Sequence, residues 1–143
     1  MQEDKVNQMI LERMQQDNQA KIEYAKRLVE NGNLDGLYEM GIRHLYGWGV
    51  EWDAEKAIEY LRKAADGNHP GACYELAKRY VEGDFSLKIS KNFDTAERYI
   101  QAGFCSSGYN PNYKDFNENL EGLKKVVDAL RHIDTKSKPK LYC

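Results

Sequence analysis

Apolar residues recur at intervals of three and four along most of the chain, which predicts an all-helical protein. Residues 1–16 carry only a narrow apolar stripe. Asp17 and Asn18 are poor interior helix residues and good N-caps, so we expect a break there. A second helix is expected over residues 19–31, and Gly32 is suited to a left-handed helix end.

The next segment has the pattern of two helices joined by a tight turn. A short helix from Gly36 to about Tyr46, with Asp35 as its N-cap, is apolar on two sides, as expected of a helix between neighbours. Gly41 lies inside it, where glycine disfavours a helix by about 1 kcal/mol relative to alanine. We therefore expect another helix to cross closely at Gly41. Asp53 is predicted to cap a second helix over residues 54–65.

The pattern then repeats. Residues 71–83 follow the earlier segment at a shift of 36, and residues 92–100 follow it at a shift of 39, so the second turn is three residues longer. A fixed period in this range is typical of a solenoid. The last helix is predicted from about Lys114 to Ile133, with one apolar stripe and a charged back, as suits a terminal cap.

The recurring residues also identify a family. They are Met40-Gly41, His44 at an aromatic-type position, Gly47-x-Gly49-Val50, Asp53, Lys56-Ala57, Tyr60 and Lys63-Ala64-Ala65-x-Gly67. This set resembles the Sel1-like repeat, a relative of the tetratricopeptide repeat. The second copy keeps Leu76-Ala77, Tyr80, Gly83, Ala96 and Tyr99, but its inserted turn replaces the Gly-x-Gly-Val sequence. The resemblance covers roughly residues 19–103.

The resemblance implies a short α/α solenoid of Sel1-like, TPR-like hairpins with terminal capping helices. Proteins of this family typically act as adaptors or scaffolds that bind other proteins, often in bacterial signalling, secretion or host interaction. The expected organisation is N-terminal helices over 1–31 (the second one a half-repeat), two repeats over 32–108, a C-terminal capping helix over 109–134, and a basic, disordered tail over 135–143.

Candidate partner-binding residues follow from exposure expected on such a scaffold. Trp48 and Trp52 flank the first turn, where tryptophan serves well as an interface anchor; the alternative is that they pack on the hairpin's own end. Tyr38, Tyr74 and Lys78 would line the first-helix surface, unless they serve packing between repeats. Phe85 lies in the inserted turn, residues 84–91, which is either a functional loop or ordinary drift in turn length.

Composition narrows the function further. The chain has 143 residues and a net charge of −2, so neither nucleic acid nor an anionic membrane is expected as a partner. Three cysteines without a Cys-x-x-Cys pair are typical of a reducing compartment, and no secretory signal or membrane span is expected. The three histidines lie on different elements, and Cys73 has the pattern of a buried thiol. No catalytic, phosphate-binding or metal-ligand motif appears, so we expect no enzyme, cofactor or metal site.

The sequence therefore predicts a cytoplasmic, non-catalytic protein–protein interaction module of bacterial or phage origin, monomeric or homodimeric. It would bind an unidentified partner through a solenoid groove and the turn edge. The alternative is a dedicated inhibitor or immunity-type protein that blocks one toxin, enzyme or defence complex by occlusion.

Overall fold

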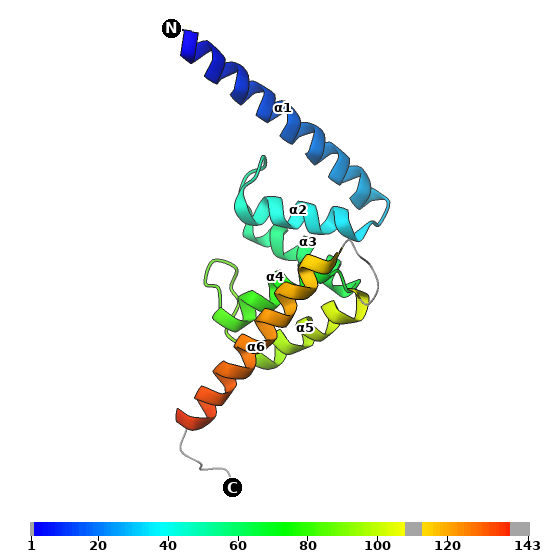
Figure 1. Cartoon of the computed structure of the whole chain (residues 1–143). Helices are drawn as coiled ribbons and strands as arrows, with labels where there is room; N and C mark the ends of the chain where they lie inside the picture. Colours follow the sequence, from blue (N-terminus) through cyan, green and yellow to red (C-terminus); the bar gives the residue numbers. More distant parts are fainter. Residues whose placement is uncertain (1, 108–112, 138–143) are drawn as a thin grey trace. The chain divides into compact units, whose positions relative to one another are not determined.

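The computed structural model describes residues 2–107 and 113–137, and within these ranges it contains six helices (Figure 1). They are α1 (Gln2–Glu30), α2 (Leu34–Tyr46), α3 (Ala54–Asp66), α4 (Pro70–Glu82), α5 (Phe93–Ser107) and α6 (Lys114–Ser137). The only β-type pairing in the described part of the chain is an isolated bridge between Asp84 and Ile89. The prediction of an all-α repeat fold is confirmed. The chain divides into two compact units, Met1–Lys63 and Ala64–Cys143, which we describe in turn.

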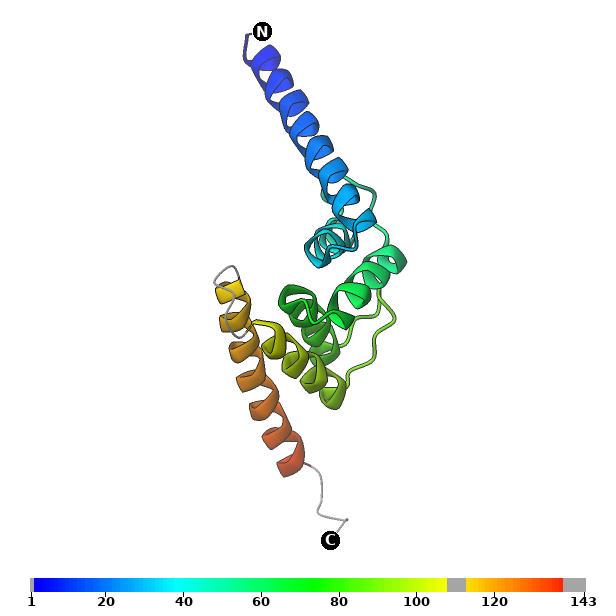
Figure 2. The ribbon, with the colours of Figure 1, turned by 90° about the vertical axis from the view of Figure 1, so that its right-hand side faces the viewer.

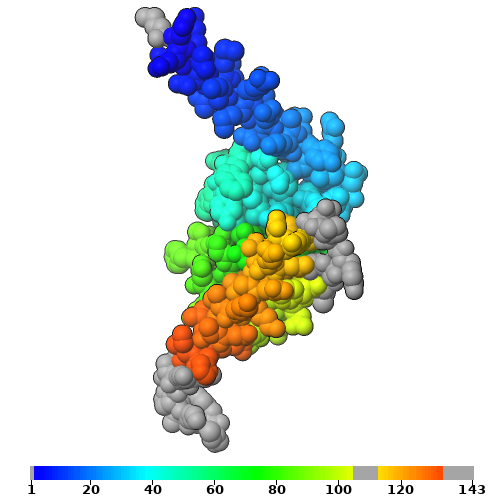
Figure 3. Space-filling view, in the orientation of Figure 1, coloured from blue at the N-terminus to red at the C-terminus, as the bar shows by residue number. Residues whose placement is uncertain are grey.

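In the first unit, α1 is one continuous helix, so the predicted break at Asp17 and Asn18 was wrong. Asp17 is exposed, and both residues lower helix propensity by only a fraction of a kcal/mol. The good helix formers on either side outweigh that loss. The N-terminal half of α1 extends beyond α2 in both ribbon views (Figures 1 and 2), and the space-filling view shows that α2 does not cover it (Figure 3).

The C-terminal half of α1 packs on α2 and forms the core of the first unit. This core contains Ile22, Ala25 and Met40, with Val29, Val50 and Tyr60 packed against it. Gly32 has a φ of +72° and ends α1 in the predicted left-handed turn. The predicted cap Asp35 was wrong, because α2 begins directly after Asn33. The Asn33 side chain accepts hydrogen bonds from the N–H groups of Asp35 (2.8 Å) and Gly36 (3.3 Å).

The close helix crossing expected at Gly41 is present. A Cβ atom on Gly41 would lie 2.8 Å from Cγ and 2.9 Å from Cδ2 of Leu61 on α3, closer than carbon atoms approach in proteins. Leu61 is fully buried, so its side chain has no free space into which to move. Glycine is therefore required at position 41 by packing between α2 and α3.

In the second unit, α4 packs on α5, and α6 packs against both of them (Figure 2). Its core contains Ala77, Val81, Ala96, Ile100, Leu120 and Val127. α6 contributes one apolar face to this core, as predicted. It continues to Ser137, four residues beyond the predicted end at Ile133. The turn-forming residues over 104–113 predict a loop, but α5 continues through its first residues to Ser107. Residues 108–112 of that segment and the rest of the predicted tail, 138–143, lie outside the described residues.

Two buried histidines have structural roles. His44 is buried and is stacked on Tyr60 with ring centroids 5.8 Å apart, so it fills the aromatic-type position of the repeat. His69 is 2% exposed and caps α4, where its Nδ1 accepts hydrogen bonds from the N–H groups of Gly71 (3.2 Å) and Ala72 (3.3 Å). Sequence reasoning missed this cap, although His69 follows the cap Asn33 at the repeat shift of 36.

Two glycine-to-alanine substitutions are expected to change stability in opposite directions. Gly41→Ala should destabilise the fold by about 1–3 kcal/mol, because its methyl group overlaps Leu61. Gly122→Ala on α6 should stabilise it by about 1 kcal/mol, because no atom lies within 4 Å and alanine favours the helix. Urea unfolding of both variants and the wild type measures the difference. Equal effects at the two sites would contradict the packing requirement at Gly41.

Two substitutions separate the contribution of the His69 cap to stability from that of its side-chain packing. His69→Ala removes the acceptor for two buried N–H groups and should destabilise the fold by about 2 kcal/mol. His69→Asn, like His69→Ala, loses the ring contacts of His69 with Tyr113 and Phe116, but it keeps an acceptor, as Asn33 does on α2. It should therefore be the more stable of the two variants in thermal unfolding. If the two melt together, the hydrogen bonds of the cap contribute little.

Candidate protein-interaction surfaces

The first candidate surface is the turn edge, residues 46–53, which joins α2 to α3 in the first unit. Three aromatic side chains on it are about half exposed: Tyr46, Trp48 and Trp52. The rings of Tyr46 and Trp48 are stacked, with centroids 5.0 Å apart. Exposed tryptophan and tyrosine side chains are typical interface anchors, because they bury a large area on binding and have few rotatable bonds to immobilise.

The buried Arg43 fixes the backbone of this turn. Its Nη1 donates to the carbonyl oxygen of Trp48 (3.0 Å), and its Nε donates to Glu39 (3.0 Å). In return, the N–H of Trp48 donates to the carbonyl oxygen of Arg43 (2.9 Å). Gly47 and Gly49 have φ values of +69° and +74°, which other residues rarely adopt. The position of Trp48 is therefore set by hydrogen bonds to a buried cation and by two glycines.

His44 fixes the other side of the turn. Its carbonyl oxygen accepts a hydrogen bond from the N–H of Asp53 (3.1 Å), and its Nδ1 lies 3.2 Å from the carbonyl oxygen of Glu51. Asp53 in turn accepts a hydrogen bond from the N–H of Lys56 (3.1 Å), which confirms it as the N-terminal cap of α3. Trp52 therefore lies between two backbone positions that are each held by hydrogen bonds.

The structure places the predicted binding residues in both units. Trp48 and Trp52 lie on the turn edge of the first unit, and Tyr38 is half-buried on α2. Sequence reasoning missed Tyr46, because its counterpart at the repeat shift of 36 is Glu82, which gives no aromatic signal. Its position two residues before Trp48, at the end of a helix, was the available clue.

The remaining predicted residues lie in the second unit. On α4, Tyr74 packs against the core and keeps part of its surface exposed, and Lys78 is half-buried one turn later. The second unit also has an open surface hollow of about 370 Å³, lined by the end of α3, by Asn68 and by residues of α5. None of the predicted residues lines it. Phe85 lies on the inserted loop, residues 84–91, which is the second candidate surface.

The inserted loop is closed by backbone and side-chain hydrogen bonds. The N–H and carbonyl groups of Asp84 and Ile89 are paired at 2.8 and 2.9 Å, and the N–H of Lys88 donates to the carbonyl oxygen of Phe85 (3.1 Å). The Asp84 carboxylate accepts hydrogen bonds from the Ser86 hydroxyl (2.6 Å) and the Leu87 N–H (3.2 Å). Leu87 and Ile89 are buried, whereas Phe85 is 100% exposed.

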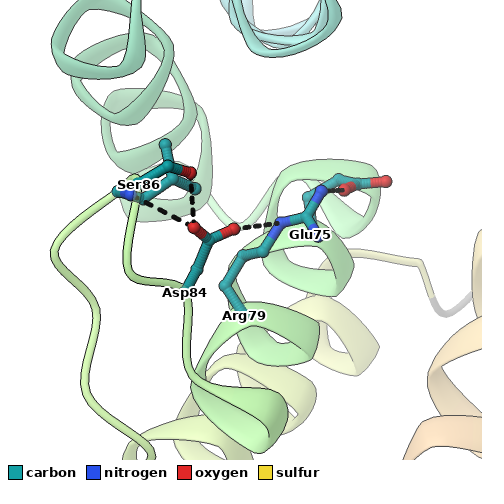
Figure 4. Close-up of polar contacts among 5 residues, drawn as sticks. Glu75, Arg79, Asp84 and Ser86 are labelled. Carbon is teal, nitrogen blue, oxygen red and sulfur yellow. Dashed lines mark hydrogen bonds and ion pairs between the residues drawn. The ribbon is translucent and has the colours of Figure 1, made fainter.

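An arginine also holds this second turn. Arg79 lies 3.9 Å from Asp84 and 3.5 Å from Glu75, and Figure 4 shows the guanidinium between the two carboxylates. Although burial alone would raise the pKa of Asp84, hydrogen bonds from Ser86 and Leu87 and the charge of Arg79 lower it below its ordinary value of 3.8. Asp84 is therefore ionised, and its interactions with the loop are complete, at neutral pH.

Other chemistry is limited in the part of the chain that the structure describes. Burial, followed by the negative charge of Asp66, raises the pKa of the Cys73 thiol to about 12, so this thiol is not a nucleophile at neutral pH. The described residues contain no group of three or more His, Cys, Asp or Glu side chains arranged to hold a metal ion. None of their helices is long and apolar enough to cross a membrane.

Comparison with known proteins identifies the repeat. The family model for the Sel1 repeat matches residues 34–69 and 70–103, which correspond to the α2–α3 and α4–α5 hairpins and their turns. The chain contains two Sel1 repeats. A Sel1 repeat protein from Oxalobacter formigenes has a similar fold, with a TM-score of 0.53 over 76% of this chain and 98% of that chain, at 20% identity.

Two curated fungal relatives match this Sel1-repeat chain at higher identity. Chitin synthase regulatory factor 2 of Schizosaccharomyces pombe is 33% identical over 63 residues, covering 44% of this chain and 12% of the relative. Chitin synthase regulator SKT5 of Malassezia restricta is 36% identical over 137 residues, covering 87% of this chain and 9% of the relative. The chain therefore spans about a tenth of the length of these relatives, and the matches do not single out the expected bacterial or phage origin.

The role of Asp84 in the loop leads to a pH-dependent prediction. Asp84→Ala should destabilise the fold at pH 7 by on the order of 1 kcal/mol, through the lost hydrogen bonds. The pKa of Asp84 is lowered in the folded chain, so its stabilisation is present above about pH 3.8 and is lost as the pH falls through that lowered pKa. The stability difference from wild type should therefore shrink in unfolding experiments from pH 7 to pH 2.

The matched control for this experiment is Ser90→Ala, which alters an exposed side chain of the same loop. It should leave stability unchanged at every pH. A stability difference for Asp84→Ala that stays constant down to pH 2 would contradict a contribution from the ionised carboxylate.

Proposed function

We propose that this Sel1-repeat chain is a non-catalytic adaptor in the cytoplasm that binds a partner protein through its exposed repeat surfaces. The proposed contact residues are Trp48, Trp52 and Tyr38 in the first unit, and Tyr74, Lys78 and Phe85 in the second. Tyr46 joins this set because it stacks on Trp48. The chain would act as a monomer or a homodimer and change the assembly or activity of its partner.

One observation carries this proposal: the stacked Tyr46–Trp48 pair is displayed on a turn whose backbone is already fixed by Arg43. A rigid surface loses little conformational entropy when it binds, so more of the contact energy appears as affinity. Tryptophan and tyrosine are the side chains most enriched among residues that dominate binding energy. The Tyr46 and Trp48 rings themselves are not part of the core of this unit.

The relatives support a regulatory form of this role. Both curated relatives are named as regulators of chitin synthase, and each is much longer than this chain. Sel1 repeats are typically non-catalytic interaction modules. We therefore propose that the partner is a protein whose activity or assembly is regulated by binding, rather than a small molecule.

Substitution of the turn edge tests the proposal. Trp48→Ala combined with Trp52→Ala should change stability by only about 1 kcal/mol per site, because about half of each side chain is exposed to water. Recovery of the partner in a quantitative pull-down from the source organism should fall at least tenfold, as for loss of about 1.4 kcal/mol or more of binding energy. Tyr24→Ala is the control, since Tyr24 is equally exposed but lies on α1.

Two results would count against this surface. A loss of stability comparable to a core truncation, about 2–5 kcal/mol, would show that the tryptophans are structural. Unchanged recovery of every partner in the double variant, with normal stability, would show that binding takes place elsewhere.

A further inference from the structure

The inserted loop also carries an exposed aromatic side chain, and its structure differs from that of the turn edge. Phe85 is 100% exposed, whereas the other large exposed hydrophobic residues in the described part of the chain range from 43% to 68%. A phenylalanine in this position adds nothing to the core. Full exposure of such a side chain is unfavourable in water, so its burial by another molecule would be favourable.

The backbone beneath Phe85 is held from several sides. Leu87 and Ile89 anchor the loop in the unit with their buried side chains, and the Asp84–Ile89 pairing closes its base. Asp84 accepts two hydrogen bonds from within the loop and faces Arg79. The hydrogen bond from Lys88 to Phe85 closes the tip. Phe85 thus projects from a preorganised turn, and binding through it needs little ordering of the chain.

The charges around Phe85 indicate the chemistry of its partner. Lys88 and Lys91 are exposed on the same loop, and the ammonium group of Lys91 lies 4.9 Å from the ring centre of Phe93. The only acidic residue of the loop, Asp84, is engaged by Arg79 and by the loop itself. The loop therefore combines a fully exposed apolar side chain with two exposed cations, a pairing that complements an apolar pocket with an acidic rim.

We propose that Phe85 inserts into an apolar pocket of a partner protein, and that Asp or Glu residues at the rim of this pocket face Lys88 and Lys91. This proposal deepens the proposed adaptor function and rests on it. A protein pocket fits the observations better than a lipid surface does. A single aromatic side chain on a rigid turn gives geometric specificity, which a fluid bilayer does not require, and anchoring to a membrane usually needs more than one such signal.

Site-specific photo-crosslinking in cells of the source organism tests the proposal. Phe85 is replaced with p-benzoylphenylalanine, and the crosslinked peptide of the partner is mapped by mass spectrometry. The expected crosslinks fall within one apolar pocket bordered by acidic residues in the structure of that partner. The same analogue at Ser90, exposed on the same loop, should crosslink at least tenfold less to that pocket. Crosslinks to lipid, scattered crosslinks or none would overturn the proposal.

Affinity measurements with the purified partner complete the test. Phe85→Ala should weaken binding at least tenfold without changing the melting temperature. Lys88→Glu combined with Lys91→Glu should also weaken binding, whereas Lys88→Arg combined with Lys91→Arg should preserve it. Equal affinity of the Glu and Arg variants would refute the acidic rim.

A crosslinker placed at Trp48 separates this inference from the adaptor function. Specific crosslinks at Trp48 with none at Phe85 would leave the adaptor function standing and reject the inserted loop as a docking element. If neither position crosslinks to a protein, both proposals fail.

Discussion

The close approach of α2 to α3 at Gly41 is the constraint on which the first hairpin depends. With a Cβ position only 2.8 Å from Leu61, the two helices are too close for any larger residue. The turn between the two helices sets a second requirement. Gly47 and Gly49 meet that need with left-handed backbone conformations. Glycine is thus required in the helix by packing and in the turn by backbone conformation.

Close packing also buries the charged side chain of Arg43, which must then be paired within the hairpin. The guanidinium is buried, and a buried charge is unfavourable unless it is paired and hydrogen-bonded. Glu39 supplies the counter-charge, and the carbonyl oxygen of Trp48 supplies a second acceptor. The same contacts that satisfy the arginine also hold the turn. Stability and the display of Trp48 therefore depend on one set of hydrogen bonds.

The sequence predicts those features that are set by short-range pattern. The helical period, the tight turn and the packing role of Gly41 each follow from residues close together in the chain. The continuity of α1 through Asp17 could not be predicted, because the weak local preference for a cap was overcome by the helix formers around it. Whether Asn33 or Asp35 caps α2 depends on the residue at which α2 begins, and sequence patterns place a helix boundary only to within one or two residues. The proposed contact residues are harder to predict, because the exposure of Tyr46 or Tyr74 depends on which other segments of the chain pack against it.

The turns of the two repeats are both held by a glutamate and an arginine, which occur at the repeat shift of 36. Glu39 and Arg43 correspond to Glu75 and Arg79, and the position of Trp48 corresponds to that of Asp84. In the first hairpin the arginine binds the backbone carbonyl at that position, and in the second it faces the side-chain carboxylate there. The carboxylate reaches further into its turn, where it also accepts hydrogen bonds from Ser86 and Leu87. The three extra residues of the second turn are thereby held in a defined conformation. In each repeat, an arginine near the end of the first helix therefore holds a turn that carries an exposed aromatic residue. This residue is Trp48 on the shorter turn and Phe85 on the longer one.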